Sequence, residues 1–434
     1  MAFDALHAAT RFGFGPTGDG ALPADPRSWL IAQLGPGDPA RFPTTLPSVS
    51  DGLILLEEQH KLKPPPGESL VAPLYRADAS AQLNALVSTT APFRERLVWF
   101  WANHFTVSTR RGDIRPIAGA FVREAIRPYV TGRFGDMLLA VMRHPAMLLY
   151  LDNASSVGPD SPAGQGGKHG LNENLARESL ELHTVSPAAG YSQADVTAYA
   201  SILTGWSVDR KSADPGFVFR DRAHQPGDKR VMGRVFPAGE AGGILMLDML
   251  ATHPATYRHL ATKLALHFVS DTPSPDTIAH LTEALATTGG DLRAVSLALI
   301  STPEAWVPRS KLRTPFDLVI AAARLVGFGD DPDPSRHGRL AGMMAALGQP
   351  VWTAPLPNGW SDRAADWCAP EAMIARIDWS YRVAARPPEA EPTQLARIAL
   401  GPDRGQRTID AMRGAGDRRD ALTLLLSSPG FQRR

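Results

Sequence analysis

Apolar residues recur at intervals of three and four along most of the chain, which is the spacing of one face of an α-helix. This spacing predicts helices at 24–35, 80–108, 115–150, 171–185, 192–206, 242–270, 275–300, 311–326, 336–347, 369–384, 390–400 and 417–428. Ser192 with Asp195 resembles a reciprocal N-terminal cap and supports one of these boundaries. We therefore expect a mainly α-helical protein.

The alternation of a half-buried strand pair is convincing in only one place. Phe217–Arg220 and Val231–Phe236 flank a turn-forming run, HQPGD at 224–228, and this arrangement predicts a small β-hairpin. No Pro- or Gly-rich stretch is long enough to be a flexible linker between independent domains. We expect a single helical domain over residues 1–434 with a β-hairpin insertion at about 214–238.

Composition and charge exclude several classes of protein. The 434 residues include 45 Lys and Arg against 44 Asp and Glu, so the net charge of +1 favours neither nucleic acid nor an anionic membrane. The single cysteine, Cys368, excludes an internal disulfide and a thiolate metal cluster built within one chain. No window approaches the roughly 20 apolar residues of a membrane span. The N-terminus lacks the pattern of a secretory signal, and we expect a cytoplasmic protein.

The segment Asn172–Thr184 has more polar surface than a helix lying on the surface can use. On a wheel of 100° per residue, Asn174, Arg177, Glu178 and Glu181 fall within one arc, whereas Asn172, Ser179 and His183 form a second polar strip opposite. One of these two strips must be buried or line a cleft, where its polar groups need partners. This helix is the first candidate for a functional site.

The chemistry of this helix centres on two carboxylates. Glu178 and Glu181 lie on adjacent turns, close enough for one to raise the pKa of the other, and Arg177 favours keeping one of them ionised. General acid–base catalysis near neutral pH needs such a pair. A solvated helix face with an Arg177–Glu181 ion pair is the structural alternative. His183 shares a face with neither carboxylate, so a metal ion would need ligands from elsewhere.

Further candidates lie outside this helix. His104 stands in the apolar run WFWANHF, which predicts a buried ring that is either a satisfied core histidine or a group that carries protons or binds a ligand. Asp152 and Asn153 end an apolar helix, either as a plain turn or in the same cleft. The Gly-rich segment 154–170 could cover that cleft, and Lys168 beside the next helix start could hold an anion.

Short motifs distributed along the chain carry a family resemblance. They are WFWANHF, MLLYLDNASSVGP, GLNENLARESLELHT, GYSQADV, LTGW, KLALHFVSD, GGDLRAV, KLRTPFDLV, and LGQPVW followed by PNGW. Together they resemble the bacterial domain-of-unknown-function 1800 family. The resemblance implies one long helical domain from about residue 5 to residue 430. Members of that family are often exported, but this chain lacks their signal. Many members have a His at the position where this chain has Ala102. A metal site that needs a histidine at that position as one of its ligands would be incomplete here.

These observations favour a hydrolase-type enzyme. In this interpretation Glu178 and Glu181 form the acid–base pair, Arg177 biases their protonation, and His183 or His104 carries protons. The candidates for substrate contact are Asp152, Asn153, Asn172, Asn174, Lys168 and Trp206. Trp206 and Trp360 lie in turns that contain glycine and could stack on a sugar ring, so the substrate is expected to be a small molecule or a glycan.

Two alternatives remain open at this stage. One is a metal-dependent enzyme that uses the carboxylates and histidines, although the sequence does not identify a metal or another cofactor. The other is a non-catalytic binding or scaffold protein, in which the polar helix belongs to a buried network that fixes how the helices pack. A cavity beside Glu178 would favour an enzyme, and a dry network with every polar atom paired would favour a scaffold.

Overall fold

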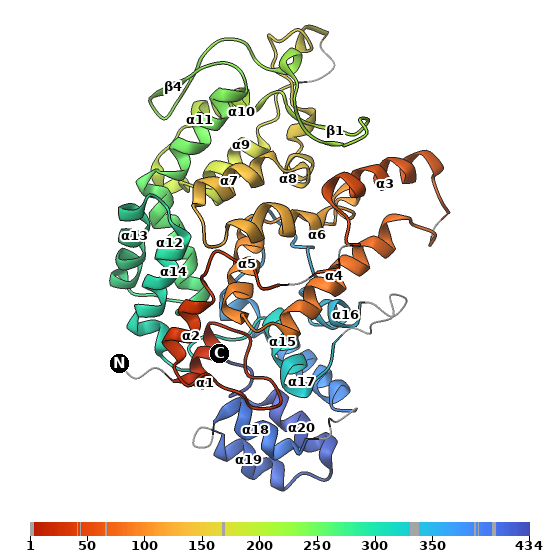
Figure 1. The fold of residues 1–434 in the computed structure, drawn as a ribbon, viewed down its shortest axis with the longest axis vertical. Helices are drawn as coiled ribbons and strands as arrows, with labels where there is room; N and C mark the ends of the chain where they lie inside the picture. Colours follow the sequence, from red (N-terminus) through yellow and green to blue (C-terminus); the bar gives the residue numbers. More distant parts are fainter. Residues whose placement is uncertain are drawn as a thin grey trace.

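The computed structural model describes residues 4–40, 42–43, 45–65, 67–166, 170–329, 338–385, 388, 390–401 and 405–434. Helices form most of this part of the chain (Figure 1). The α-helices are α1 (Ala5–Arg11), α2 (Pro26–Ala32), α3 (Val49–Leu62), α4 (Val71–Ser88), α5 (Pro92–His104), α6 (Ala118–Phe121), α7 (Phe134–Arg143), α8 (Pro145–Tyr150), α9 (Asn174–Glu178), α10 (Gln193–Leu203), α11 (Glu240–Ala251), α12 (Pro254–Phe268), α13 (Pro275–Thr288), α14 (Leu292–Ser301), α15 (Pro315–Val326), α16 (Arg339–Ala346), α17 (Pro370–Val383), α18 (Pro392–Leu400), α19 (Gln406–Arg413) and α20 (Arg418–Ser427). The predicted mainly α-helical class is confirmed.

Several long helices predicted by periodicity are broken in the structure. Pro92, Pro145 and Pro254 each stand at the first position of a new helix, α5, α8 and α12. Proline lacks the N–H that a helix interior requires, but at the first position that N–H has no partner in any case. Apolar residues on both sides of each break face the core, so the spacing of three and four continues across it. Periodicity therefore predicted burial correctly but not where each helix ends.

Within the described residues, the strands form two small antiparallel hairpins rather than one. They are β1 (Trp206–Asp209) with β2 (Gly216–Phe219), and β3 (Lys229–Val231) with β4 (Arg234–Phe236). The predicted pairing of residues 217–220 with residues 231–236 is wrong, because each segment pairs with a nearer neighbour. Met232 and Gly233 both have positive φ, at 48° and 80°, and form the tight two-residue turn that joins β3 to β4. Closing this two-residue turn costs less chain entropy than closing the longer loop between residues 220 and 231 that the predicted hairpin required.

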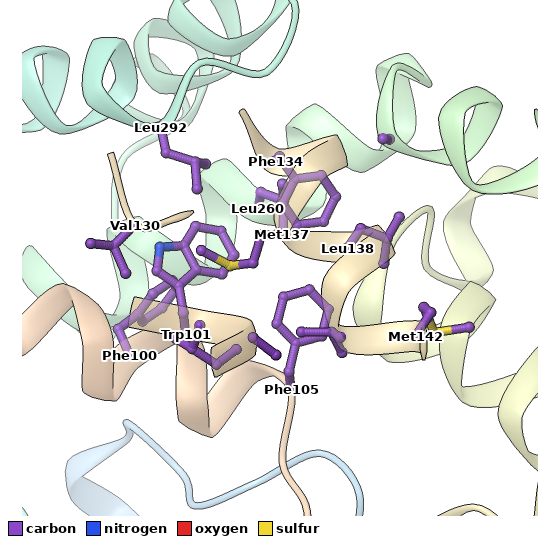
Figure 2. Packing of buried hydrophobic residues seen from close by; sticks show 14 of the residues in the cluster. Phe100, Trp101, Phe105, Val130, Phe134, Met137, Leu138, Met142, Leu260 and Leu292 are labelled. Carbon is purple, nitrogen blue, oxygen red and sulfur yellow. The ribbon is translucent and has the colours of Figure 1, made fainter. Parts of the chain in front are cut away.

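The buried side chains form two apolar clusters that meet at α5. In Figure 2, Phe100 and Trp101 of α5 and Phe105, which follows it, pack against side chains of α7, α12 and α14 in the first cluster. The second cluster contains residues of α15, α17 and α20, and Trp99 of α5 packs against it. Helix α5 runs through the middle of the molecule, with the strands near one end and α18–α20 at the other (Figure 1). Side chains at its C-terminal half are thus held by both clusters.

None of the described helices combines the length and the apolar character that a membrane span requires.

Candidate functional site

The polar segment predicted as one helix is irregular. Helix α9 ends at Glu178, and Ser179–His183 form a π-helical turn. A π-turn holds more residues than an α-turn, so the wheel of 100° per residue does not apply beyond Glu178. Ser179 and His183 are fully buried, while Arg177 and Glu178 are half-buried. The expected burial of one polar strip is therefore confirmed for Ser179 and His183, while Asn172 of the same strip is half-buried.

The two carboxylates of this segment remain candidates. Burial raises the pKa of Glu178, the charge of Glu181 raises it further, and Arg177 opposes both. The guanidinium of Arg177 pairs with Glu173 at 2.8 Å, instead of forming the Arg177–Glu181 pair of the structural alternative. The acid–base role of Glu178 and Glu181 stays a prediction.

Three histidines surround the end of the π-turn. His104 Nε2 lies 3.1 Å from the carbonyl oxygen of His183, and His259 Nε2 lies 2.9 Å from that of Leu182. Carbonyls at a helix end lack partners within the helix, and these two imidazoles supply them. His104 thus matches the expected core histidine bonded to a carbonyl. Burial lowers the pKa of His104 and lowers that of His183 to about 3. Among the described residues, no three His, Cys, Asp or Glu side chains are arranged to hold a metal ion together.

The candidates for substrate contact are dispersed. Asp152 forms a bidentate pair with Arg111 at 2.6 and 2.7 Å. The Asn153 amide donates to the carbonyls of Leu203 and Trp206, and its side chain is buried. Trp206 is itself 0% exposed. This burial argues against the expected stacking of Trp206 on a sugar ring, because the indole is part of the core.

Two further candidates take part in the turn that precedes α9. The Asn172 side-chain oxygen accepts a hydrogen bond of 2.9 Å from the Asn174 backbone N–H, while the side chain of Asn174 is exposed. The backbone N–H of Asn172 is in turn bound by Ser156 Oγ. These contacts give Asn172 a structural role in starting the helix. Lys168 lies outside the described residues.

A cavity beside α5 brings together residues that are far apart in the sequence. Its walls come from Phe14, from α5 and the two residues Thr106 and Val107, from the end of α12, from the start of α15, and from two loops at 349–354 and 360–362. The space that the centres of water molecules can occupy in this cavity is about 90 Å³. One water needs roughly 10–15 Å³ in this measure, so the cavity has room for a small ligand as well as water.

His267 and Asp362 form a pair at this cavity. His267 Nδ1 lies 2.7 Å from Asp362 Oδ1, although 95 residues separate them in the chain. The His267 side chain is 14% exposed, and its other ring nitrogen, Nε2, is buried with no hydrogen-bond partner among the described residues. Burial lowers the pKa of His267, against the opposing effect of Asp362. Burial disfavours the charge on Asp362, but His267 and Lys311 outweigh it and hold the pKa of this carboxyl well below its usual range.

Two lining residues of the cavity, Arg96 and Asp317, belong to a buried ion network. Asp317 forms ion pairs with Arg96, at 2.9 Å from Nη1, and with Arg434, at 3.0 Å from Nε, and all three side chains are buried. Arg434 also donates to the His267 carbonyl at 3.0 Å. Lys311 donates to the carbonyl oxygen of Asp362 at 2.6 Å. These contacts fix the backbone on both sides of the His267–Asp362 pair.

Asn103 fastens the loop that carries Asp362. Its side chain exchanges two hydrogen bonds with the Trp360 backbone, at 2.9 Å to the carbonyl and 2.8 Å from the N–H. Gly359 lies directly against this clamp with a φ of 76°, and a Cβ atom there would stand 2.4 Å from the Asn103 carbonyl oxygen. Only glycine fits, because both the positive φ and the close approach exclude a side chain.

Gly359→Ala is therefore expected to move this loop. We expect a loss of about 1–3 kcal/mol in the free energy of unfolding, together with weaker binding or turnover at the cavity. Urea unfolding checks the first effect. Gly216→Ala is a matched control, because a Cβ at Gly216 would meet no atom within 4 Å. Equal stability of the two variants would contradict the clamp.

Sequence reasoning missed this cavity as a site. Its lining comes largely from motifs quoted for the family resemblance: WFWANHF, KLALHFVSD, KLRTPFDLV, LGQPVW and PNGW. Each places a polar residue within an apolar context. That signal did not reveal that the five segments meet, because they are spread along the chain from residue 99 to residue 360.

Comparison with known proteins agrees with the resemblance. The model of a family described as "Protein of unknown function (DUF1800)" matches residues 7–433. Neither the curated proteins nor the solved structures contain a match to the chain.

Proposed function

Because the chain belongs to the DUF1800 family, whose description leaves the activity open, we propose from the cavity that the protein is a hydrolase-type enzyme with His267 as its general base. The observation that carries this proposal is the pairing of His267 with Asp362 at the wall of a cavity. An ionised carboxylate only accepts hydrogen bonds, so Nδ1 of His267 holds the proton and Nε2 holds a lone pair. A base whose second nitrogen is oriented by a carboxylate is the arrangement that proton transfer requires.

The protonation state supports this role. Burial keeps the pKa of His267 below its ordinary value of 6.5, so the imidazole is neutral at pH 7 and its Nε2 can accept a proton. The nearby Asp362 carboxylate stabilises the imidazolium that forms when it does. In the proposed reaction a water molecule in the cavity loses a proton to Nε2 as its oxygen attacks the substrate, and the same proton passes to the leaving group.

Glu178 provides a second candidate for the catalytic carboxylate. Its raised pKa is the property of a general acid that keeps its proton closer to neutral pH. The cavity is favoured over this position because it combines the base, its orienting carboxylate and enclosed space. A glycan is not favoured as substrate, because most of the cavity wall is apolar and a sugar would bury several hydroxyl groups without partners.

The proposal is tested by incubating the purified protein with a panel of small chromogenic esters, amides and glycosides. We expect hydrolysis with kcat/KM constant around pH 7 and falling only on the acid side, below pH 6.5, as Nε2 of His267 becomes protonated. The sign follows from the lowered pKa, since the neutral base persists to a lower pH than free histidine. Elemental analysis of the same preparation tests the metal-dependent alternative.

Glu178→Gln separates the two candidate positions. If His267 is the base, this variant keeps turnover and is no less stable than the parent, because removing a carboxylate with a raised pKa relieves a cost of its ionisation. Loss of all turnover in folded Glu178→Gln protein would instead place the chemistry at α9. If no substrate in the panel is turned over, the enzyme proposal fails and the non-catalytic scaffold protein is the interpretation that remains.

A further inference from the structure

The walls of the cavity restrict its ligand to an apolar molecule. Most of the lining surface is apolar, and Phe14, Trp99, Val107, Phe316, Val351 and Trp352 contribute to it. The rings of Trp99 and Trp352 are nearly parallel, with an interplanar angle of 9° and centroids 6.1 Å apart, and Phe316 packs against Trp99 at 4.8 Å. Apolar surface of this kind favours a ligand that loses little hydration on entering.

The charges at the wall are already paired. The ionisable side chains that line the cavity are Arg96 with Asp317, and His267 with Asp362, and each partner faces the other at 2.9 Å or less. Arg96 also directs two N–H groups to the Gly13 carbonyl. Among the described residues of the lining, a charged ligand would find no free counter-charge, and it would lose its hydration without compensation. The ligand is therefore expected to be uncharged.

The remaining polar atoms define what the ligand must offer. The buried indole N–H groups of Trp99 and Trp352 have no hydrogen-bond partner within the described part of the chain, and neither has His267 Nε2. Indole N–H only donates, and the neutral Nε2 accepts. These two donors and one acceptor belong to side chains that line the cavity, in an apolar surrounding. A carbonyl oxygen matches the donors, and an attacking water molecule matches the acceptor.

We propose, resting on the hydrolase function proposed above, that this cavity takes an uncharged carboxylic ester with an apolar acyl group, whose carbonyl oxygen is bound by the indole N–H groups of Trp99 and Trp352. An ester fits better than an amide because its carbonyl carbon is attacked more readily, and the buried imidazole of His267 is a weak base. Donors held at the carbonyl oxygen stabilise the negative charge that develops there in the transition state.

The reaction balances with water as the only co-reactant. The water oxygen forms a bond to the carbonyl carbon while His267 Nε2 takes one of its protons, and the carbonyl electron pair moves to the oxygen beside the two indoles. That pair then returns, the bond from carbon to the alkoxy oxygen breaks, and Nε2 gives its proton to the departing alcohol. One ester and one water become one carboxylic acid and one alcohol.

The test compares two esters that differ in charge. The probes are p-nitrophenyl butyrate, which is uncharged, and mono-p-nitrophenyl succinate, whose acyl chain of equal carbon number ends in a carboxylate. We expect kcat/KM for the butyrate to be higher by about tenfold or more, since the carboxylate must be desolvated. A preference for the succinate, or hydrolysis of amides but not esters, would overturn the inference while leaving the hydrolase proposal standing.

Removing the donors tests the carbonyl contact. Trp99→Phe and Trp352→Phe keep an aromatic ring but lose the N–H, and each is expected to lower kcat for the butyrate by about tenfold or more with little change in KM, because the donors act on the transition state. Trp379→Phe is the matched control: its indole N–H is also buried and has no hydrogen-bond partner among the residues that the structure describes, but it lies on α17 outside the cavity wall. If both variants fold and keep an unchanged kcat, the contact between the indoles and the carbonyl oxygen is refuted.

The parent protein separates this inference from the proposed function. Absence of turnover by the parent protein on both esters would refute the inference, and absence of turnover on the whole panel would refute the hydrolase function as well.

Discussion

His267→Asn is expected to reduce kcat by about 10²–10⁴-fold while the protein stays folded, which is the usual contribution of a positioned general base. Asparagine is nearly isosteric with the Nδ1 side of the imidazole, so its amide can still donate to Asp362. It has no counterpart of Nε2, and the proton of the attacking water then has no acceptor. The imidazole is neutral at pH 7, so the substitution changes no charge and we expect the unfolding midpoint to move little.

Asp362→Asn complements this experiment. Its amide can donate to Nδ1 and so favour the tautomer with the proton on Nε2, which removes the lone pair that the reaction needs. We expect a loss of kcat of similar size although His267 is still present. His259→Asn serves as the control, because that ring also binds through one nitrogen, to the Leu182 carbonyl at 2.9 Å, but does not line the cavity. Retained turnover in folded His267→Asn protein would exclude His267 as the base.

Asp317→Asn is expected to have the largest effect on stability, a loss of about 3–5 kcal/mol in the free energy of unfolding. The Asp317 carboxylate neutralises Arg96 and Arg434 inside the protein, where all three side chains are at most 3% exposed. Without it, two guanidinium groups remain buried with no charged partner. Urea unfolding at constant m-value measures the loss. Asp410→Asn is the control, since Asp410 pairs with Arg413 on the surface and should cost less than about 1 kcal/mol.

The same carboxylate gives stability a dependence on acid pH. Burial opposes its ionisation, but Arg434 and Arg96 outweigh this and lower the pKa of Asp317 from 3.8 to about 2 in the folded protein. A lowered pKa means that the contribution is fully present above pH 4 and is lost as the pH falls from about 4 to about 2. The parent should lose more stability across this window than Asp317→Asn does. Parallel curves would show that Asp317 does not act through its charge.

Local sequence was sufficient for the helical class and for much of the burial. The periodicity identified most helices, Ser192 and Asp195 form the predicted reciprocal cap, and the apolar surroundings of His104 correctly predicted a buried ring. These features depend on neighbours three or four residues away, which is the range over which a helix brings side chains together. The family resemblance likewise came from the motifs alone, and the match over residues 7–433 confirms it.

The candidate site depended on the tertiary structure. Nothing local pairs His267 with Asp362, or sets Trp99 beside Trp352, because packing of the two apolar clusters decides which loops meet at α5. The π-turn after Glu178 and the partners of the strands were also outside what periodicity reports. An apolar pattern indicates that one face of a helix is buried, but it does not identify the elements against which that face packs. Sequence thus determined which residues lie inside this protein, and only the fold decided which of them face a common cavity.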